Sequence, residues 1–215
     1  YDEPGNGMHF HIQLRKGGRN IFYEKGAYAD LSEQALCFIG GILKHGRSLT
    51  AFTNPSTNSF KRLLPGFEAP VKLFFGLANR SAAIRIPKYA TSEEAKRIEF
   101  RTSDGTCNYY LAMSALLMAG LDGIRNRILP NESNGFGPFD DNIFDWPEDR
   151  QNRLESIPAS LEEALEALQD DHEYLMAGGV FNRELIDSWV KEKTKEVLAV
   201  RNRPHPFEMN LYYSL

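Results

Sequence analysis

The chain has 215 residues, of which 42% are hydrophobic and 25% are charged, and its formal net charge is −4. This length suits one sizeable domain, and the composition predicts a packed core rather than a disordered chain. The acidic balance argues against a general binder of nucleic acid, although it allows a local cluster of arginines.

Cysteine usage and the first residues bear on the cellular setting. Cys37 and Cys107 lie in unrelated contexts without paired spacing, which favours a reducing, cytoplasmic compartment. No apolar run reaches the roughly 18 residues of a membrane span, so no membrane contact is expected. The chain shows no secretory signal, lacks an initiator methionine and opens in a Gly-rich turn, so we interpret it as a fragment of a longer protein.

The first predicted elements are a strand and a helix. Residues 8–14 alternate between apolar and polar side chains, which predicts a strand, and the glycine pair at 17–18 turns the chain back. Asp30, with Glu33 three residues later, predicts a capping box at the start of a helix that continues to about His45.

The middle of the chain combines a long loop with short strands. Residues 50–70 are rich in Thr, Asn, Ser, Pro and Gly and show no period, which predicts an ordered loop. Residues 71–76 are apolar and fit either a helix or a strand. Residues 82–86 and 97–101 predict strands.

Helices dominate the second half. Residues 108–124, rich in Ala, Leu and Met, predict a helix, whereas residues 125–158 are typical of loops. A capping box opens a helix over residues 160–168, and residues 182–200 predict a long charged helix. The tail over residues 204–215 is expected to be extended.

Two of these strands carry side chains suited to chemistry. Residues two apart on a strand project from the same face, so His9 and His11 point together. Arg97, Glu99 and Arg101 share a face for the same reason. A metal–phosphate site uses this mixture, with imidazole and carboxylate ligands for the ion and guanidinium groups for phosphate oxygens. Each pattern alone is more often a solvated surface face, so both interpretations stay open.

The long loop and the segment after it carry further charged residues. Arg62, Glu68, Arg80 and Arg85 punctuate a region too rich in aromatic residues and leucine for disorder. Such a loop suits a lid over an anionic ligand, whose identity the composition leaves open. The sequence holds no Walker A, dinucleotide-binding or nucleophile-elbow motif.

Five strings occur in the order found in one enzyme family. Residues 5–11 (GNGMHFH) are similar to a GSGMHxH box, and residues 54–70 (NPSTNSFKRLLPGFEAP) are similar to NPTTNSYKRLVPGYEAP. Residues 79–87 (NRSAAIRIP) and 97–101 (RIEFR) match NRSASIRIP and RIEVR, and the tail at 211–215 (LYYSL) is like ELYYSV. The chain therefore resembles the C-terminal catalytic part of type I glutamine synthetases over nearly its whole length.

The resemblance implies an α+β fold in which a curved antiparallel sheet forms a half-barrel with flanking helices, as in glutamine synthetase and guanido kinase-like catalytic domains. Residues 1–215 are expected to form one domain, the C-terminal part of that catalytic domain. The family's small β-grasp domain and its other metal-ligand glutamates are expected to lie N-terminal to this segment. The fragment alone is therefore expected to be inactive.

The resemblance also assigns roles on the nucleotide side of the site. It makes His9 and Glu99 ligands of one Mg²⁺ or Mn²⁺ ion that bridges the phosphates of ATP. It places His11 and Arg85 at the nucleotide phosphates, with Arg97 as a packing or ATP contact.

On the glutamate side, the resemblance implies that Arg62 and Arg101 hold the substrate, aided by the backbone of Gly5. Arg80 is expected to contact the transferring phosphoryl group, so that it serves substrate and nucleotide alike. Glu68 is expected to lie on a flap that closes over the glutamate. There its carboxylate would help to form the ammonium site and accept a proton from ammonium.

The implied reaction is ATP-dependent ligation of ammonia to the γ-carboxylate of L-glutamate through γ-glutamyl phosphate. The implied assembly is a double-ring homo-oligomer, expected to be a dodecamer, and no nucleic acid or membrane partner is expected. Two alternatives stay open. One is a γ-glutamyl ligase for a polyamine or another amine, and the other is a catalytically silent paralogue.

Some positions depart from the family pattern, but none of them is a metal or glutamate ligand. The tyrosine that some bacterial members adenylylate aligns with Phe144, so that regulation is expected to be absent. The other departures are Pro4, Asn6, Gln13, Ala78, Glu94 and Tyr109.

Overall fold

The computed structural model describes residues 5–64 and 69–213. The main sheet is four-stranded, in the order β1 (Phe10–Ile12), β6 (Ile98–Phe100), β5 (Ala82–Ile86) and β4 (Lys72–Leu77). Strand β6 lies antiparallel to both β1 and β5, whereas β4 runs parallel to β5. The predicted α+β class with flanking helices is confirmed. The sheet is mixed rather than antiparallel throughout, because of this one parallel pair.

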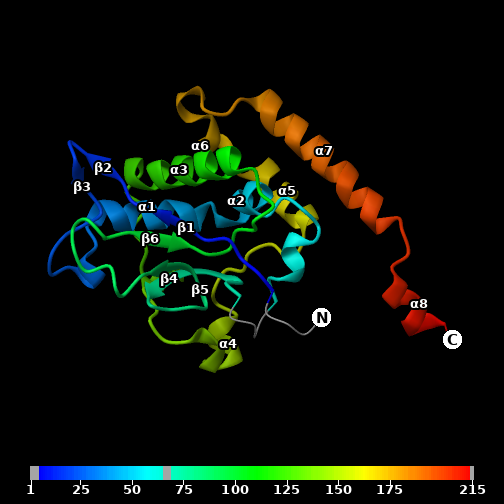
Figure 1. Cartoon of the computed structure of the whole chain (residues 1–215), viewed down its shortest axis with the longest axis horizontal. Helices are drawn as coiled ribbons and strands as arrows, with labels where there is room; N and C mark the ends of the chain where they lie inside the picture. The colour runs from blue at the N-terminus through cyan, green and yellow to red at the C-terminus, as the bar shows by residue number, and fades with distance from the viewer. Residues whose placement is uncertain (1–4, 65–68, 214–215) are drawn as a thin grey trace.

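Two helices lie side by side along the sheet (Figure 1). They are α1 (Glu33–Lys44) and α3 (Tyr109–Arg125). Their backbones approach closely, because a Cβ atom added at Gly41 would lie 2.1 Å from the carbonyl oxygen of Ala119 and 2.6 Å from the backbone nitrogen of Gly123. Only glycine permits this approach, which lets α1 and α3 pack closely against each other in one helical layer.

The remaining elements are short or peripheral. A hairpin of β2 (Arg15–Lys16) and β3 (Arg19–Asn20) turns at Gly17 and Gly18, whose φ angles are 58° and 82°, as the sequence predicted. Further helices are α2 (Gly46–Thr53), α4 (Glu148–Gln151), α5 (Leu161–Asp170), α6 (Glu173–Met176), α7 (Arg183–Arg201) and α8 (Pro206–Tyr212). Short 3₁₀ turns lie at Tyr28–Asp30, Ser59–Lys61, Glu132–Asn134, Ile143–Asp145 and Ala177–Gly179.

The predicted cap of the first helix is wrong by two residues. Helix α1 begins at Glu33, and its N-cap is Ser32, whose Oγ accepts a hydrogen bond from the backbone nitrogen of Ala35. Asp30 instead ends the preceding turn with a positive φ of 52°, and its carboxylate accepts from the backbone nitrogen of Gly26. Both residues have the side chain of a good cap, and the turn geometry selects Ser32.

Two further expectations are corrected. The first residues of the predicted 50–70 loop belong to α2, which continues to Thr53. The tail forms helix α8 rather than an extended segment, because His205 caps its N-terminus and the carboxylate of Glu208 accepts a hydrogen bond from the backbone nitrogen of His205. Figure 1 shows α8 beyond the end of α7, away from the sheet.

The ambiguous apolar segment is strand β4, and both of its faces are covered. Phe75 points into the main core between the sheet and the helices, whereas its neighbour Phe74 packs with Phe139 and Leu154 in a second, smaller cluster. A strand buried on both sides has no polar alternation, which explains why its sequence pattern was ambiguous. Within the described ranges, no helix combines the length and the apolar character needed to cross a bilayer.

Candidate active site

Glu99, at the centre of β6, is the middle of the candidate site. It pairs in register with His11 on β1 and with Arg85 on β5, and its exposed fraction is 1%. Its Oε1 accepts hydrogen bonds from Nδ1 of His9 at 2.8 Å and from Nη1 of Arg101 at 3.2 Å. Its Oε2 accepts from Nε of Arg85 at 2.7 Å. The sheet thus gathers side chains from distant parts of the sequence around one buried carboxylate.

Electrostatics keep this carboxylate ionised. Burial on its own raises the pKa of Glu99, but the hydrogen bonds from His9 and Arg85 and the charges of Arg85 and Arg101 outweigh it and lower the pKa to about 2. Burial also lowers the pKa of His11, with further lowering by Arg97, His9 and Arg85 against the opposing effect of Glu99. The site therefore offers an anionic oxygen and a largely neutral imidazole at neutral pH.

The separation of His9 and Glu99 fits two ligands of one divalent cation. Two ligand atoms about 2.1 Å from an octahedral ion and at right angles to each other lie about 3 Å apart. The observed separation between Nδ1 of His9 and Oε1 of Glu99 is 2.8 Å, and a cation bound between them would replace the proton of their hydrogen bond. The His9 side chain is 28% exposed, so an ion can reach this pair from solvent.

Arg62 lies against the glycines of the histidine box. A Cβ atom added at Gly7 would lie 2.1 Å from Nη2 of Arg62, so the absence of a side chain at Gly7 makes room for the guanidinium. The aliphatic part of Arg62 lies beside Gly5, where an added Cβ would be 3.4 Å from Cγ. The guanidinium donates to the carbonyls of Ser103 and Arg101 at 3.3 and 3.4 Å, and burial lowers its pKa. The predicted proximity of Gly5 and Arg62 is present.

Arg101 links the carboxylate to the turn that carries Arg80. Its guanidinium is buried, and Nη2 donates to the carbonyl of Arg80 at 3.0 Å. Within the described part of the chain, Nε of Arg101 is a buried donor without an acceptor. The turn is held by Asn79, whose Nδ2 donates to the carbonyls of Phe139 and Asp141 and whose Oδ1 accepts from the backbone nitrogen of Ser81. The side chain of Arg80 itself is exposed.

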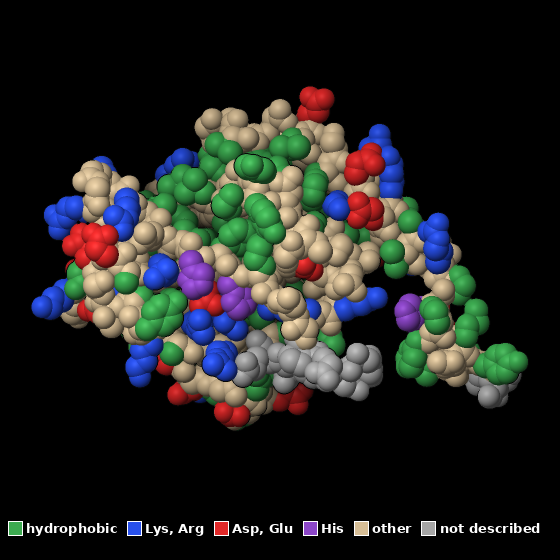
Figure 2. Space-filling model, viewed as in Figure 1, with side chains coloured by type: hydrophobic (Ala, Val, Ile, Leu, Met, Phe, Trp, Pro, Cys, Tyr) green, Lys and Arg blue, Asp and Glu red, His purple; other side chains and the backbone are tan. Residues whose placement is uncertain are grey.

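The predicted residues divide into three groups. Arg97 lies at the edge of the cluster, since its charge lowers the pKa of His11, its Nε donates to the carbonyl of Ala95, and its guanidinium lies 5.9 Å from the ring centroid of Tyr89. Glu68 lies outside the described residues. The structure gathers the others on one side of the sheet, where Figure 2 shows histidine and basic side chains close together. They are Gly5, His9, His11, Arg62, Arg80, Arg85, Glu99 and Arg101.

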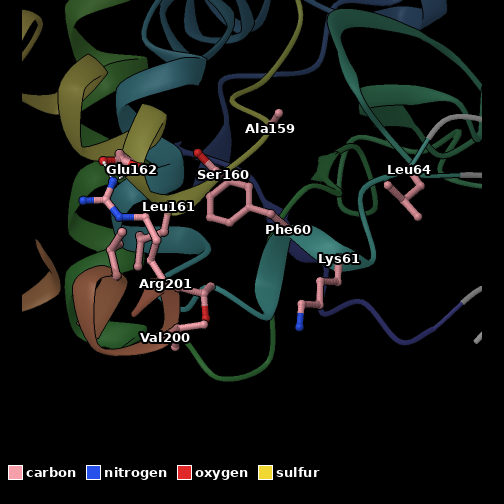
Figure 3. Close-up of a pocket in the computed structure, with 11 residues that line it drawn as sticks. Phe60, Lys61, Leu64, Ala159, Ser160, Leu161, Glu162, Val200 and Arg201 are labelled. Carbon is pink, nitrogen blue, oxygen red and sulfur yellow. Dashed lines mark hydrogen bonds and ion pairs between the residues drawn. The ribbon is translucent and has the colours of Figure 1, made fainter. Parts of the chain in front are cut away.

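A groove with other lining residues is shown in Figure 3. Its volume is about 340 Å³, and it lies between the turn at Ser59–Lys61, the start of α5 and the end of α7. Apolar side chains such as Phe60 and Val200 line it, and an ion pair between Arg201 and Glu162 at 3.0 Å flanks it. None of the predicted site residues that the structure describes lines the groove.

Two residues of the site were not singled out from the sequence. Asn54 and Ser103 are fully buried. Asn54 donates to the carbonyl of Thr102 in the segment that follows β6, and the carbonyl of Ser103, in the same segment, accepts from Arg62. Asn54 is the first residue of the family-like string at residues 54–70, and this position was the sequence feature that could have identified it. Ser103 follows another string directly and had no signal of its own.

Comparison with known proteins agrees with the resemblance found in the sequence. Residues 1–212 match the family model described as "Glutamine synthetase, catalytic domain". The chain is 52% identical to a glutamine synthetase of Neisseria gonorrhoeae over 99% of its length, and 51% identical to one of Pseudomonas aeruginosa over 100%. It covers 44% of each of these proteins, so it spans less than half of their length. Among solved structures, a Plasmodium falciparum glutamine synthetase is 32% identical with a TM-score of 0.83, over 97% of this chain and 47% of that one.

Proposed function

The chain belongs to the glutamine synthetase catalytic-domain family, and we propose that the protein of which it is part ligates ammonia to the γ-carboxylate of L-glutamate in an ATP-dependent reaction. Residues 1–215 would form the C-terminal part of the catalytic domain. The observation that carries the proposal is the buried, ionised Glu99, which is paired with His9 and surrounded by arginines on one side of the sheet. This combination suits a reaction in which a cation and guanidinium groups meet several phosphate and carboxylate oxygens.

We place a Mg²⁺ or Mn²⁺ ion at His9 and Glu99. Within the described residues no third His, Cys, Asp or Glu joins this pair, so water, substrate phosphates and residues elsewhere would complete the coordination. When bound, the ion would neutralise charge on the phosphates of ATP and polarise the transferring group. His11 and Arg85 would bind the neighbouring phosphate oxygens.

The arginines would orient the substrate and stabilise charge. Arg62 and Arg101 would hold carboxylate oxygens of L-glutamate, so that a γ-carboxylate oxygen attacks the γ-phosphorus of ATP and ADP leaves. Arg80 would stabilise the charge on the transferring phosphoryl group, which spreads over its equatorial oxygens. In the second step, the nitrogen of ammonia attacks the acyl carbon of γ-glutamyl phosphate, and phosphate leaves.

We further propose that Glu68 closes the site and accepts the proton that ammonium must lose before it attacks. The flap matters because an acyl phosphate hydrolyses in water. This assignment is supported by the resemblance of residues 54–70 to the family string. It predicts that Glu68→Ala in the full-length enzyme hydrolyses ATP without a matching yield of glutamine. A normal yield of glutamine per ATP would favour a ligase for another amine.

A double-ring assembly is the proposed context, with α8 as one contact between subunits. Phe207, Met209, Leu211 and Tyr212 are each more than half exposed, which is unfavourable for apolar side chains unless a partner covers them. Deletion of residues 204–215 from the full-length protein is expected to split the rings, and an unchanged sedimentation profile would contradict this. We propose a cytoplasmic location on the basis of two free, buried cysteines.

The test of the proposed function is an assay of the full-length protein with ATP, glutamate and one amine at a time. Glutamine and phosphate are expected to form in equal amounts with ammonia, and putrescine is expected to give no comparable rate. A product formed only with putrescine would support the alternative γ-glutamyl ligase. A correctly assembled protein with no turnover of either amine would support a silent paralogue.

A further inference from the structure

Three consecutive carbonyls after β6 are each held by a side chain. Arg62 donates to the carbonyls of Arg101 and Ser103, the first and third of the series, at 3.4 and 3.3 Å. The middle carbonyl, that of Thr102, accepts from Nδ2 of Asn54 at 2.8 Å. The peptide groups that receive Arg62 are therefore held in place by Asn54.

The side chain of Asn54 has one defined orientation. It caps the C-terminus of α2 and is fully buried. Its Oδ1 accepts from Oγ1 of Thr53 at 2.7 Å, which directs Nδ2 toward Thr102. A second link runs beside it, since the backbone nitrogen of Asp104 donates to the carbonyl of Thr53 at 2.9 Å. Helix α2, which is far from Arg101 in sequence, thus determines where the segment after β6 lies.

The same segment determines the position of Arg101. The backbone nitrogen of Arg101 donates to the carbonyl of Ala83, and its side chain reaches Glu99 and the carbonyl of Arg80. Within the described residues the hydroxyl of Thr102 is buried without a partner. The side chain of Thr102 therefore does not fix this segment, which is held through hydrogen bonds to its backbone groups. Movement of the Thr102 peptide would therefore shift Arg101 together with the carbonyls that hold Arg62.

We propose that Asn54 is a positioning residue for the two substrate-binding arginines. By holding the Thr102 peptide, its side-chain amide determines the spacing between the guanidinium groups of Arg62 and Arg101. The inference rests on the proposed function, in which this pair binds the carboxylate oxygens of L-glutamate. Guanidinium recognition of carboxylates depends on geometry, so a small displacement weakens binding of glutamate more than binding of ATP.

The test is Asn54→Ala in the full-length enzyme, with KM measured for each substrate. Removal of one amide donor is expected to raise the KM for glutamate roughly tenfold, with the KM for ATP changed less than about twofold. An unchanged KM for glutamate in a folded variant would overturn the inference.

A matched control lies at the other end of β6. Asn20 is also a buried asparagine, and its Nδ2 donates to the carbonyls of Glu93 and Lys96 at 2.8 and 2.7 Å, just before the strand begins. Asn20→Ala is expected to lower Tm without a change in the KM for glutamate. If Asn20→Ala and Asn54→Ala raise this KM equally, the effect reflects general loosening and the positioning role is refuted.

Two milder variants keep the inference testable if Asn54→Ala does not fold. Asn54→Ser shortens the side chain, and Thr53→Val keeps the donor but removes the hydroxyl that orients it. Both are expected to raise the KM for glutamate, Asn54→Ser the more strongly, and unchanged values in both would contradict the inference. A wild-type protein that makes no glutamine would contradict the proposed function itself. An active wild type with unaffected variants would contradict only the role of Asn54.

Discussion

Two histidine–carboxylate clusters in this molecule have nearly the same contact distance and different surroundings. Nδ1 of His9 lies 2.8 Å from Glu99, and Nδ1 of His45 lies 2.8 Å from Asp171. Around Glu99 the neighbours are mainly arginines. Around His45 they are mainly anionic or neutral, since its Nε2 lies 3.0 Å from a second carboxylate, that of Asp122, which Lys44 Nζ approaches only at 3.8 Å.

In the second cluster the polar groups satisfy one another's hydrogen bonds. Ser48 donates to Asp171 at 2.9 Å and shares a hydrogen bond with the hydroxyl of Tyr174, whose ring stacks on His45 at 3.9 Å. These side chains join the α1–α2 junction to α3, α5 and α6. The cluster around Glu99 instead has a surplus of cations and a buried donor without an acceptor, Nε of Arg101, among the described residues. A surplus of donors indicates a site for an anionic ligand, whereas a balanced network indicates a structural role.

The largest expected effect is that of Glu99→Gln, which keeps the shape of the side chain and removes its charge. Activity of the full-length enzyme is expected to fall at least about 10²-fold, because the proposed cation loses its anionic ligand and the arginines lose their counter-charge. The matched variant Asp171→Asn makes the same chemical change in the second cluster and is expected to keep kcat within about twofold. Equal losses of activity in the two variants would remove the distinction between the clusters.

The next effect concerns the room left for Arg62. Gly7→Ala places a methyl group where the guanidinium lies, so Arg62 must move and the KM for glutamate is expected to rise roughly 10–100-fold. Gly105→Ala is the control, because a Cβ atom at Gly105 meets nothing within 4 Å. The KM for glutamate is measured by steady-state kinetics for both variants. Similar values would show that the contact at Gly7 is unimportant for substrate binding.

The smallest expected effect on catalysis is that of His45→Ala. Loss of the imidazole leaves Asp122 and Asp171 facing each other without their shared donor. The free energy of unfolding, measured in urea, is therefore expected to fall by about 2 kcal/mol. The exposed part of Asp171 limits this loss, since solvent can hydrate its carboxylate. The folded variant is expected to keep its kcat/KM. A large loss of activity at full folding would indicate coupling between the two clusters.

The sequence predicted local structure better than it predicted connections. The i, i+2 spacing correctly placed Glu99 and Arg101 together, because side chains on a strand alternate between faces. It did not separate Arg97, which shares the spacing but turns toward Tyr89 at the end of the strand. The parallel pairing of β4 with β5 was also missed, because pairing direction depends on the connection between strands rather than on either strand's residues.

Residues that act through the backbone were the hardest to predict. Asn54 and Ser103 contact peptide groups, and the partner of such a hydrogen bond leaves no pattern in the sequence. Helix α8 had a readable signal, since Pro206 at the first helical position and Glu208 after His205 are typical of a helix start. The roles of the site residues came from the resemblance and stay predictions until they are tested.

The most direct test of the central claim is the binding of Mn²⁺ to the full-length enzyme, measured by electron paramagnetic resonance. If His9 and Glu99 share one cation, then His9→Ala and Glu99→Gln are expected to weaken the same class of site by about 10–100-fold. Asp171→Asn, in the cluster around His45, is expected to bind Mn²⁺ as the wild type does. Wild-type affinity and stoichiometry in both the His9→Ala and Glu99→Gln variants would contradict the account.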